Sequence, residues 1–256
     1  RGNSPKNVLW RLEGIEIPNP NHFSGLGTTG GAISMLNANV LGTSDFYTGA
    51  FPAEMGNALS GVFDMKFRNG NTEKREHTFQ LSTLGTELAS EGPFKKGGKS
   101  SYLLNYRYST LALLENIVSF GGVLPKYQDA SIKLNFPTAK AGTFSLWGLG
   151  GYNSAYKDPV KDSSKWTDDD PNFVLKADNM MGVAGISHTY FTGKNSYLKT
   201  VVSASYEKNK ELVDTLNPAQ DYRSVHVANE SFVNNAYRVS VLYNTKLNNK
   251  NTVRVG

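Results

Sequence analysis

The sequence predicts a mainly β protein, most of which forms an antiparallel sheet. Its 256 residues include 25 glycines, 13 tyrosines and 13 phenylalanines, a composition that favours strands joined by tight turns. From about residue 73 onward, apolar and polar residues alternate with a period of two, which is the spacing of a strand. The apolar stretches are far shorter than the ~20 residues of a membrane helix. Any membrane crossing would therefore use strands.

Composition also excludes several classes of function. Hydrophobic residues make up 39% of the chain and charged residues 19%, and there is no cysteine, so we expect a folded protein without disulfides or thiol chemistry. Basic and acidic residues balance within residues 1–72, and the net charge of +5 arises beyond them. The basic residues stand singly along strands instead of clustering with stacking aromatics, which argues against a nucleic-acid partner.

The first 71 residues are glycine-rich and irregular. Residues 8–17 predict a small hairpin that turns at Glu13-Gly14, and residues 18–31 contain loop-forming Asn, Pro and Gly. Pro52 to Met55 predict one turn of helix with proline at its first position. Residues 61–67 alternate and predict a strand that closes this part of the chain.

The remaining residues predict a series of amphipathic strands. Weaker alternation occurs at 142–153, 183–191 and 197–206, and three segments show it clearly. Their apolar faces carry Tyr102, Leu104, Tyr106 and Tyr108; Ala130, Ile132, Leu134 and Phe136; and Tyr237, Val239, Val241 and Tyr243. This alternation fits a soluble sandwich, whose apolar face is the core, as well as a membrane barrel, whose apolar face meets lipid.

The connections between these segments favour the barrel. Short connections at 93–98, 137–142, 192–195 and 248–251 alternate with long ones at 110–127, 155–175 and 214–230. Outer-membrane barrels have short periplasmic turns and long extracellular loops. If the short connections are periplasmic, the strand at 100–109 runs outward. If the barrel also begins at the periplasm, an even number of strands must precede this one, so residues 74–92 should form a hairpin that bends near residues 83–85.

Residues 1–110 resemble the TonB-dependent receptor family. The resemblance is carried by Arg1-Gly2, by residues 8–17 (VLWRLEGIEI) with the following Asn-Pro-Asn-His-Phe, and above all by residues 47–71 (YTGAFPAEMGNALSGVFDMKFRNGN). The last block is similar to the end of the family's plug domain, in the subgroup with a carboxypeptidase-regulatory-like N-terminal extension. Glu91-Gly92-Pro93-Phe94 resembles the first periplasmic turn of the barrel.

The resemblance implies a fragment of a large barrel. Residues 1–71 would be the C-terminal portion of a small α+β plug domain, and residues 72–256 would be about nine strands of a barrel of about 22. The chain opens at Arg1 without a methionine and ends in what resembles another strand, so we expect it to continue at both ends. The plug-motif residues are Arg1, Gly2, Gly14, Gly49, Glu54, Gly56, Gly61, Asp64 and Arg68. We expect the glycines to serve backbone geometry, through a positive φ or a close approach to the barrel wall.

The implied function is TonB-dependent uptake of a scarce nutrient across the outer membrane of a Gram-negative bacterium. The nutrient classes left open are siderophores, haem, cobalamin, oligosaccharides and peptides, and the implied partners are TonB with its inner-membrane complex and outer-membrane lipid. Alternatives are a passive porin or adhesin barrel and a soluble secreted β-sandwich. Candidate residues for the barrel lumen are Arg107, Lys133 and Arg238, and for the extracellular loops Trp166, Asp168, Asp169, Asp170, Tyr222 and Arg223. Arg107 is predicted to pair with a plug carboxylate, for which Glu54 is the candidate.

No catalytic residue, cofactor or metal is expected. The four histidines lack the spacing of metal ligands, and Ser60-Gly61 lacks the frame of a nucleophile elbow. The three consecutive aspartates at 168–170 could bind Ca²⁺, but they lack the spacing of a calcium loop and fit a solvated loop better.

Overall fold

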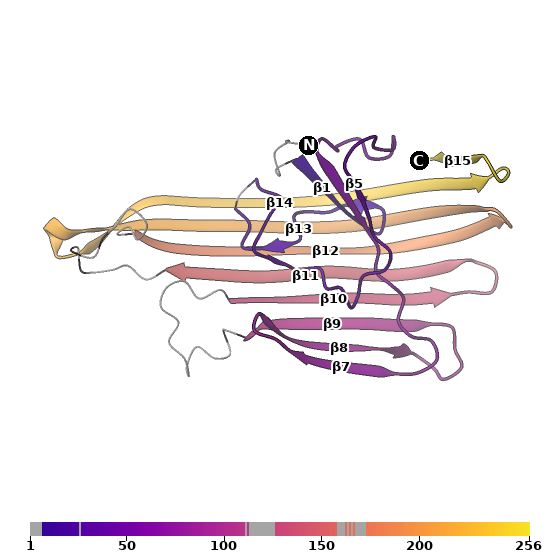
Figure 1. Ribbon diagram of the computed structural model, residues 1–256, viewed down its shortest axis with the longest axis horizontal. Helices are drawn as coiled ribbons and strands as arrows, with labels where there is room; N and C mark the ends of the chain where they lie inside the picture. The colour runs from indigo at the N-terminus through magenta and orange to yellow at the C-terminus, as the bar shows by residue number, and fades with distance from the viewer. Residues whose placement is uncertain are drawn as a thin grey trace.

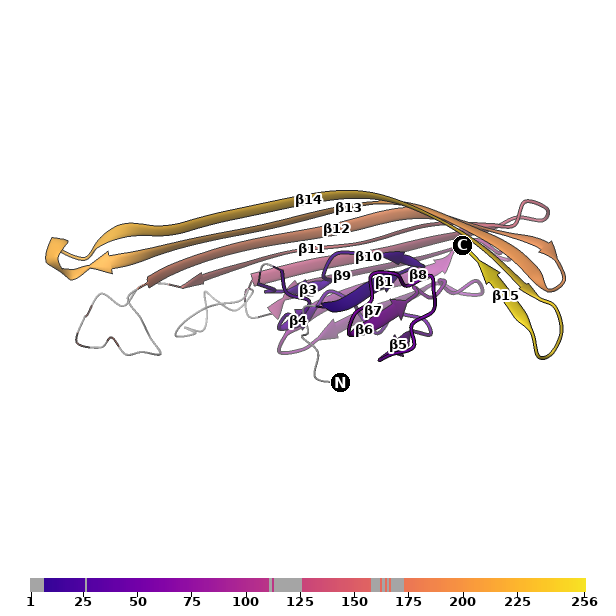
Figure 2. The same cartoon turned by 90° about the horizontal axis from the view of Figure 1, so that it is seen from above.

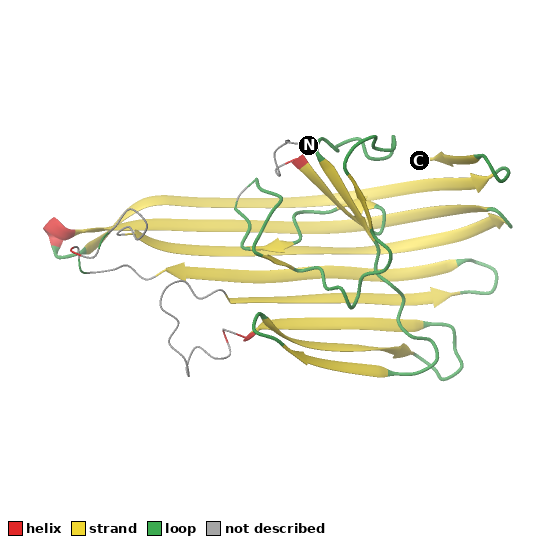
Figure 3. Cartoon of the chain, viewed as in Figure 1, coloured by secondary structure: helices red, strands yellow, loops and turns green. Residues whose placement is uncertain are grey.

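The computed structural model describes residues 7–25, 27–110, 112, 126–157, 162, 164, 166 and 173–256. Strands and loops make up most of this part of the chain (Figure 3). Six short strands come first: β1 (Val8–Leu12), β2 (Ile15–Glu16), β3 (Asn21–His22), β4 (Ile33–Ser34), β5 (Asp45–Tyr47) and β6 (Gly61–Met65). They form a four-stranded sheet in the order β2-β1-β6-β5, with β3 and β4 as a separate pair.

The remaining strands form one antiparallel sheet of nine strands in sequential order, which we call the wall. They are β7 (Glu76–Leu81), β8 (Gly85–Pro93), β9 (Ser101–Ser109), β10 (Lys126–Pro137), β11 (Thr143–Lys157), β12 (Phe173–Gly193), β13 (Ser196–Asn217), β14 (Arg223–Lys246) and β15 (Thr252–Val255). The sheet is open, because its edge strands β7 and β15 do not pair with each other. The predicted hairpin at 74–92 is confirmed as β7 and β8.

The wall is curved, and β1–β6 lie together on its concave side (Figures 1 and 2). We call the face toward β1–β6 the inner face and the opposite one the outer face. Large apolar side chains are exposed on the outer face; Tyr237, for example, is 85% exposed. Polar and apolar residues alternate where the strands pass the short strands, so most aromatic side chains there lie on the outer face while the inner face packs against β1–β6.

Two expectations about local structure are wrong. Residues 52–55 form a turn instead of helix: the Met55 amide donates to the Pro52 carbonyl at 2.9 Å, which closes a turn without starting an i to i+4 ladder. The connection predicted at 214–230 is mostly strand, since β13 has 22 residues and β14 has 24. These strands exceed the 9–11 residues that cross a membrane, and the polar ends of the hairpin meet at the short 3₁₀ helix η3 (Pro218–Gln220).

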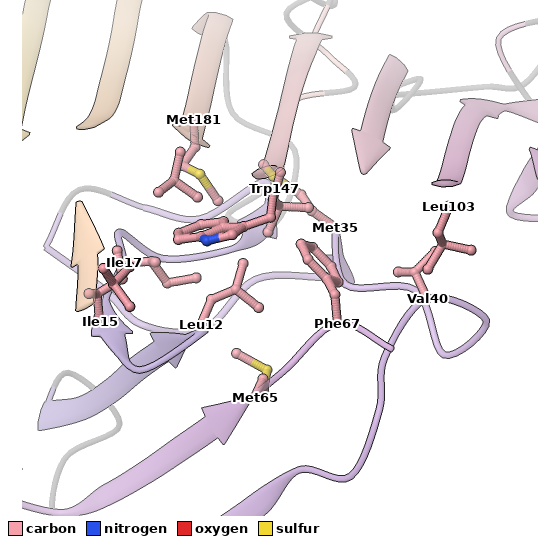
Figure 4. Close-up of a cluster of buried hydrophobic side chains, with 13 residues drawn as sticks. Leu12, Ile15, Ile17, Met35, Val40, Met65, Phe67, Leu103, Trp147 and Met181 are labelled. Atoms are coloured by element: carbon pink, nitrogen blue, oxygen red, sulfur yellow. The ribbon is translucent and has the colours of Figure 1, made fainter. Parts of the chain in front are cut away.

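The contact between β1–β6 and the wall has an apolar centre at Trp147, whose side chain is fully buried (Figure 4). The short strands and their loops contribute Leu12, Ile15, Ile17, Met35, Val40, Met65 and Phe67 to this cluster, and the wall contributes Leu103, Trp147, Leu149, Met181, Val183 and Val201. The largest apolar cluster is therefore shared between the two parts of the chain, while a smaller one, around Leu9, Met55 and Val62, lies within the short strands alone.

A glycine on β12 makes room for the Trp147 ring. Gly185 is the cross-strand partner of Trp147, and a Cβ there would lie 2.4 Å from the indole Cζ2. We expect Gly185→Ala to destabilise the full-length protein by about 1–3 kcal/mol through overpacking, measured as a lower temperature of unfolding. Gly182→Ala on the same strand is the matched control, because nothing lies within 4 Å of its Cβ position. Equal effects of the two substitutions would contradict this prediction.

Candidate functional site

The region with the most buried charge is the contact between the short strands and the inner face of the wall. Three ion-paired clusters join the two parts around the Trp147 core. Each links a side chain of residues 7–71 to side chains of the wall. We take this contact as the candidate functional site.

The first cluster forms at the tip of the β1–β2 hairpin. Glu13 and Gly14 have φ values of +56° and +95°, as a two-residue turn of the type I′ family requires. This turn places the Glu13 carboxylate, 4% exposed, against the wall. Lys133 Nζ lies 2.6 Å from Glu13 Oε1, and Lys199 Nζ lies 3.6 Å from Oε2. Two lysines of the wall therefore share one carboxylate.

Backbone groups complete this cluster. The Phe67 amide donates to Glu13 Oε1 at 3.1 Å, while Lys133 also donates to the Phe67 carbonyl at 3.0 Å. Lys199 donates to the Glu13 carbonyl at 2.9 Å. The charges are thus paired and hydrogen-bonded, which is the condition under which burial of charge is tolerated.

The second cluster surrounds His22, whose side chain is fully buried. His22 Nε2 lies 2.9 Å from Asp129 Oδ2, and the Arg107 guanidinium donates to the same oxygen at 2.7 Å. Arg107 also donates to the Ser34 carbonyl, and Asn153 Nδ2 lies 3.4 Å from His22 Nδ1. The β3–β4 pair is therefore held against three strands of the wall.

The third cluster lies near the start of the wall. Arg68 donates two parallel hydrogen bonds of 2.6 Å to the Glu91 carboxylate of β8, a geometry that matches a guanidinium to a carboxylate. The Asn71 amide donates to the same carboxylate at 2.8 Å. The hydrogen bonds that Arg68 donates to the Glu91 carboxylate raise the pKa of Arg68 above its usual value. This cluster ties the segment that leads into β7 to the neighbouring strand.

The structure corrects the predicted partner of Arg107. Arg107 bonds to Asp129 instead of a carboxylate of residues 1–71, because the register of β9 and β10 places the two residues side by side. Glu54 instead accepts a hydrogen bond from Arg254 of β15 at 2.9 Å. Of the other lumen candidates, Lys133 meets Glu13 as described, and Arg238 donates to Ser205 Oγ at 3.1 Å.

The described loop candidates, Trp166, Tyr222 and Arg223, lie at the end of the wall away from the short turns. The rings of Trp166 and Tyr222 meet edge to face with centroids 6.2 Å apart, although 56 positions separate them in the sequence. Arg223 is the first residue of β14 and pairs in register with Asn217. Arg1, Gly2 and Asp168 to Asp170 lie outside the described residues.

The predicted motif glycines differ in what they do. Gly14 has the positive φ of a turn residue, and a Cβ at Gly61 would lie 3.2 Å from the Phe46 ring. Gly49 and Gly56 have neither a positive φ nor a neighbour within 4 Å of a Cβ. The expectation that backbone geometry requires glycine is therefore wrong at these two positions. Asp64 pairs in register with Arg11, and its buried Oδ1 has no hydrogen-bond partner among the described residues.

Sequence reasoning missed five of the residues that form these clusters. They are His22, Glu91, Asp129, Trp147 and Lys199. Three of them, Asp129, Trp147 and Lys199, could have been assigned to the inner face from the alternation of their strands. Within the described ranges, no group of three or more His, Cys, Asp or Glu side chains could hold a metal ion. No helix in the described part of the chain is long and apolar enough to span a membrane.

Comparison with known proteins identifies a related fold. No family model matches the chain, and no curated protein matches it. Among solved structures, the chain is similar to the siderophore receptor PirA from Acinetobacter baumannii, with a TM-score of 0.58 and 16% sequence identity. The match covers 96% of this chain and 38% of the receptor chain. The chain therefore has the fold of a part of that receptor and spans well under half of its length.

Proposed function

We propose that the chain is part of a TonB-dependent outer-membrane transporter that takes up a scarce nutrient. In this proposal residues 1–71 are the end of the plug and residues 72–256 are the first strands of the barrel. The observation that supports it most directly is that a small folded unit, β1–β6, packs on the concave face of the antiparallel wall. The likeness in fold to a siderophore receptor supports the same assignment.

The size of the inner unit favours a wide barrel. The interior of an eight-stranded barrel is just filled by its own side chains, whereas outer-membrane transporters of about 22 strands hold a plug in the lumen. The described part of residues 1–71 forms six strands inside the curve of the wall. A barrel that closes around such a unit needs many more than the nine strands of this wall. A passive porin or adhesin would not explain a separate folded unit attached by three ion-paired clusters, two of them buried.

The outer face counts against a soluble β-sandwich. A sandwich would bury its aromatic face against a second sheet, yet Tyr106, Tyr152 and Tyr237 are exposed on the wall. Exposed apolar and aromatic side chains are those that a barrel presents to lipid. We therefore place the outer face in the outer membrane.

The contact between plug and wall suits a gate. Ion pairs and hydrogen bonds make up much of it, and wall residues Ser101, Asn105, Asp129 and Ser131 each have a buried side-chain oxygen without a hydrogen-bond partner among the described residues. Water commonly satisfies such groups, and a hydrated polar contact can rearrange more readily than a dry one. Force transmitted through TonB would break these contacts and open a path for the nutrient, without a chemical step.

Transport is tested by uptake. The full-length protein should support growth on one nutrient among siderophores, haem, cobalamin, oligosaccharides and peptides, and deletion of TonB should abolish that growth. Expression of the protein from a plasmid in a deletion strain is the control. Growth that depends on the protein but persists without TonB would favour the passive porin.

A further inference from the structure

The four short turns of the wall carry only positive charge. They connect β8 to β9, β10 to β11, β12 to β13 and β14 to β15, and all lie at one end of the sheet, on the right in Figure 1. Between the strand ends they contain six lysines, Lys95, Lys96, Lys99, Lys140, Lys194 and Lys250, and no aspartate or glutamate. All six side chains are exposed. Within the described ranges, none of them forms an ion pair with a carboxylate.

The opposite end of the wall has mixed charge. There the described ends of β11 to β14 carry Lys157, Lys176, Lys208 and Lys210, together with Glu211, Asp214 and Glu230. His226 and Asp214 lie 2.9 Å apart at this end. The uniform positive charge is therefore a property of the short turns and does not follow from the basic composition of the chain.

Aromatic side chains place the lysines relative to a membrane. On the outer face beside the short turns, Phe94 stacks on Phe136 at 5.3 Å, Phe144 stacks on His188 at 4.2 Å, and the rings of His188 and Tyr190 lie 6.3 Å apart. Rings of this kind form the girdle of a membrane barrel at the level of the lipid headgroups. In the first three short turns the lysines follow a girdle ring within about five residues, and Lys250 lies in the turn at the same end of the sheet. Their ammonium groups therefore lie at or just beyond the headgroup phosphates.

We propose that the lysines of the short turns bind anionic phospholipid headgroups in the leaflet that faces these turns. Charge complementarity identifies this partner: a lipid phosphate is an anion that the adjacent aromatic girdle brings to the height of the lysines. Lysine suits a lipid surface because it acts as a flexible point charge and needs no fixed geometry. The proposal rests on the membrane barrel of the proposed function and adds a lipid partner to it.

The test measures lipid selectivity at the protein surface. The full-length protein is reconstituted into phosphatidylcholine bilayers that contain either spin-labelled phosphatidylglycerol or spin-labelled phosphatidylcholine, and the protein-associated fraction of each probe is compared. We expect phosphatidylglycerol to associate about twofold or more strongly, since each lysine near the surface attracts an anionic headgroup. High salt should reduce this preference.

Two variants with the same net charge show which end of the wall produces the lipid preference. The turn variant Lys96→Gln, Lys140→Gln, Lys194→Gln, Lys250→Gln removes one lysine from each short turn. The control variant Lys157→Gln, Lys176→Gln, Lys208→Gln, Lys210→Gln removes four at the opposite end. The turn variant should lose at least half of the preference, and the control variant should keep it. An equal loss in both variants, or no loss in either, overturns the proposal.

Other results distinguish lipid binding from binding to a protein and from failure of the proposed transport. A turn variant that loses uptake but keeps its lipid selectivity would show that the turns meet an acidic periplasmic protein, which also overturns the lipid assignment. Uptake that fails while selectivity depends on the turn lysines contradicts transport and supports the lipid site. A protein that does not insert into bilayers contradicts both.

Discussion

Replacing Glu13 with glutamine is expected to loosen the β1–β2 hairpin from the wall by about 3 kcal/mol or more, because the change leaves buried lysines without their counter-charge. Lys133 and Lys199 both approach this carboxylate, at 2.6 and 3.6 Å. Glutamine has nearly the same shape as glutamate and tolerates the same backbone, so the loss reports the charge. Hydrogen exchange of residues 8–17 in the full-length protein should accelerate about 100-fold or more, at tenfold per 1.4 kcal/mol.

The same hairpin supplies the control. Glu16 lies three residues away and accepts one exposed hydrogen bond, from Asn57 at 3.0 Å. Glu16→Gln should therefore leave the exchange of the hairpin nearly unchanged. The double variant Glu13→Gln, Lys133→Gln should recover part of the protection, because it removes one of the stranded charges. Equal exchange in the Glu13 and Glu16 variants would show that the buried pairs do not hold the hairpin.

Replacing Trp147 with alanine is expected to destabilise the full-length protein by about 3–5 kcal/mol, the usual cost of truncating a buried aromatic side chain. Its ring packs against both the wall and the short strands (Figure 4), and its Nε1–H donates to Ser187 Oγ at 2.9 Å. Trp147→Phe keeps most of the ring and loses that hydrogen bond, so a smaller cost of about 1 kcal/mol is expected. The temperature of unfolding in detergent measures both.

An exposed aromatic residue of the wall serves as the comparison. Tyr237 is 85% exposed on the outer face, and Tyr237→Ala removes a ring of similar size without opening a cavity in the core. It should shift the unfolding temperature far less than Trp147→Ala. If the two variants are equally stable, Trp147 is not the centre of a core shared by the short strands and the wall.

Sequence patterns predicted much of the wall, because a strand in a sheet with one polar and one apolar face must alternate polar and apolar residues. The hairpin at 74–92 and the β1–β2 turn at Glu13-Gly14 were both predicted in the right place. The extension of β13 and β14 was not predicted, since their distal halves have polar residues on both faces and only short apolar alternations such as Val225 and Val227. Beyond a membrane or a core, neither face of a strand needs to be apolar.

Which side chains pair within the candidate site was harder to predict than which face of a strand each side chain lies on. Alternation assigns Arg107 and Lys133 to the inner face, but it does not say which side chain they meet. Arg107 pairs with Asp129 because the register of β9 and β10 places the two residues opposite each other. Lys133 pairs with Glu13, 120 positions earlier, because the short strands β1–β6 pack on the wall. Such contacts depend on how two surfaces fit together, which no local pattern encodes.

In the proposed function the wall belongs to a closed barrel in the outer membrane. Fractionation of cells that express the full-length protein, followed by gel electrophoresis with and without boiling, tests for that barrel. A barrel resists unfolding by detergent until it is heated, so the protein should appear in the outer-membrane fraction and migrate differently after boiling. A soluble protein with the same migration before and after boiling would contradict the claim and favour a secreted β-sandwich.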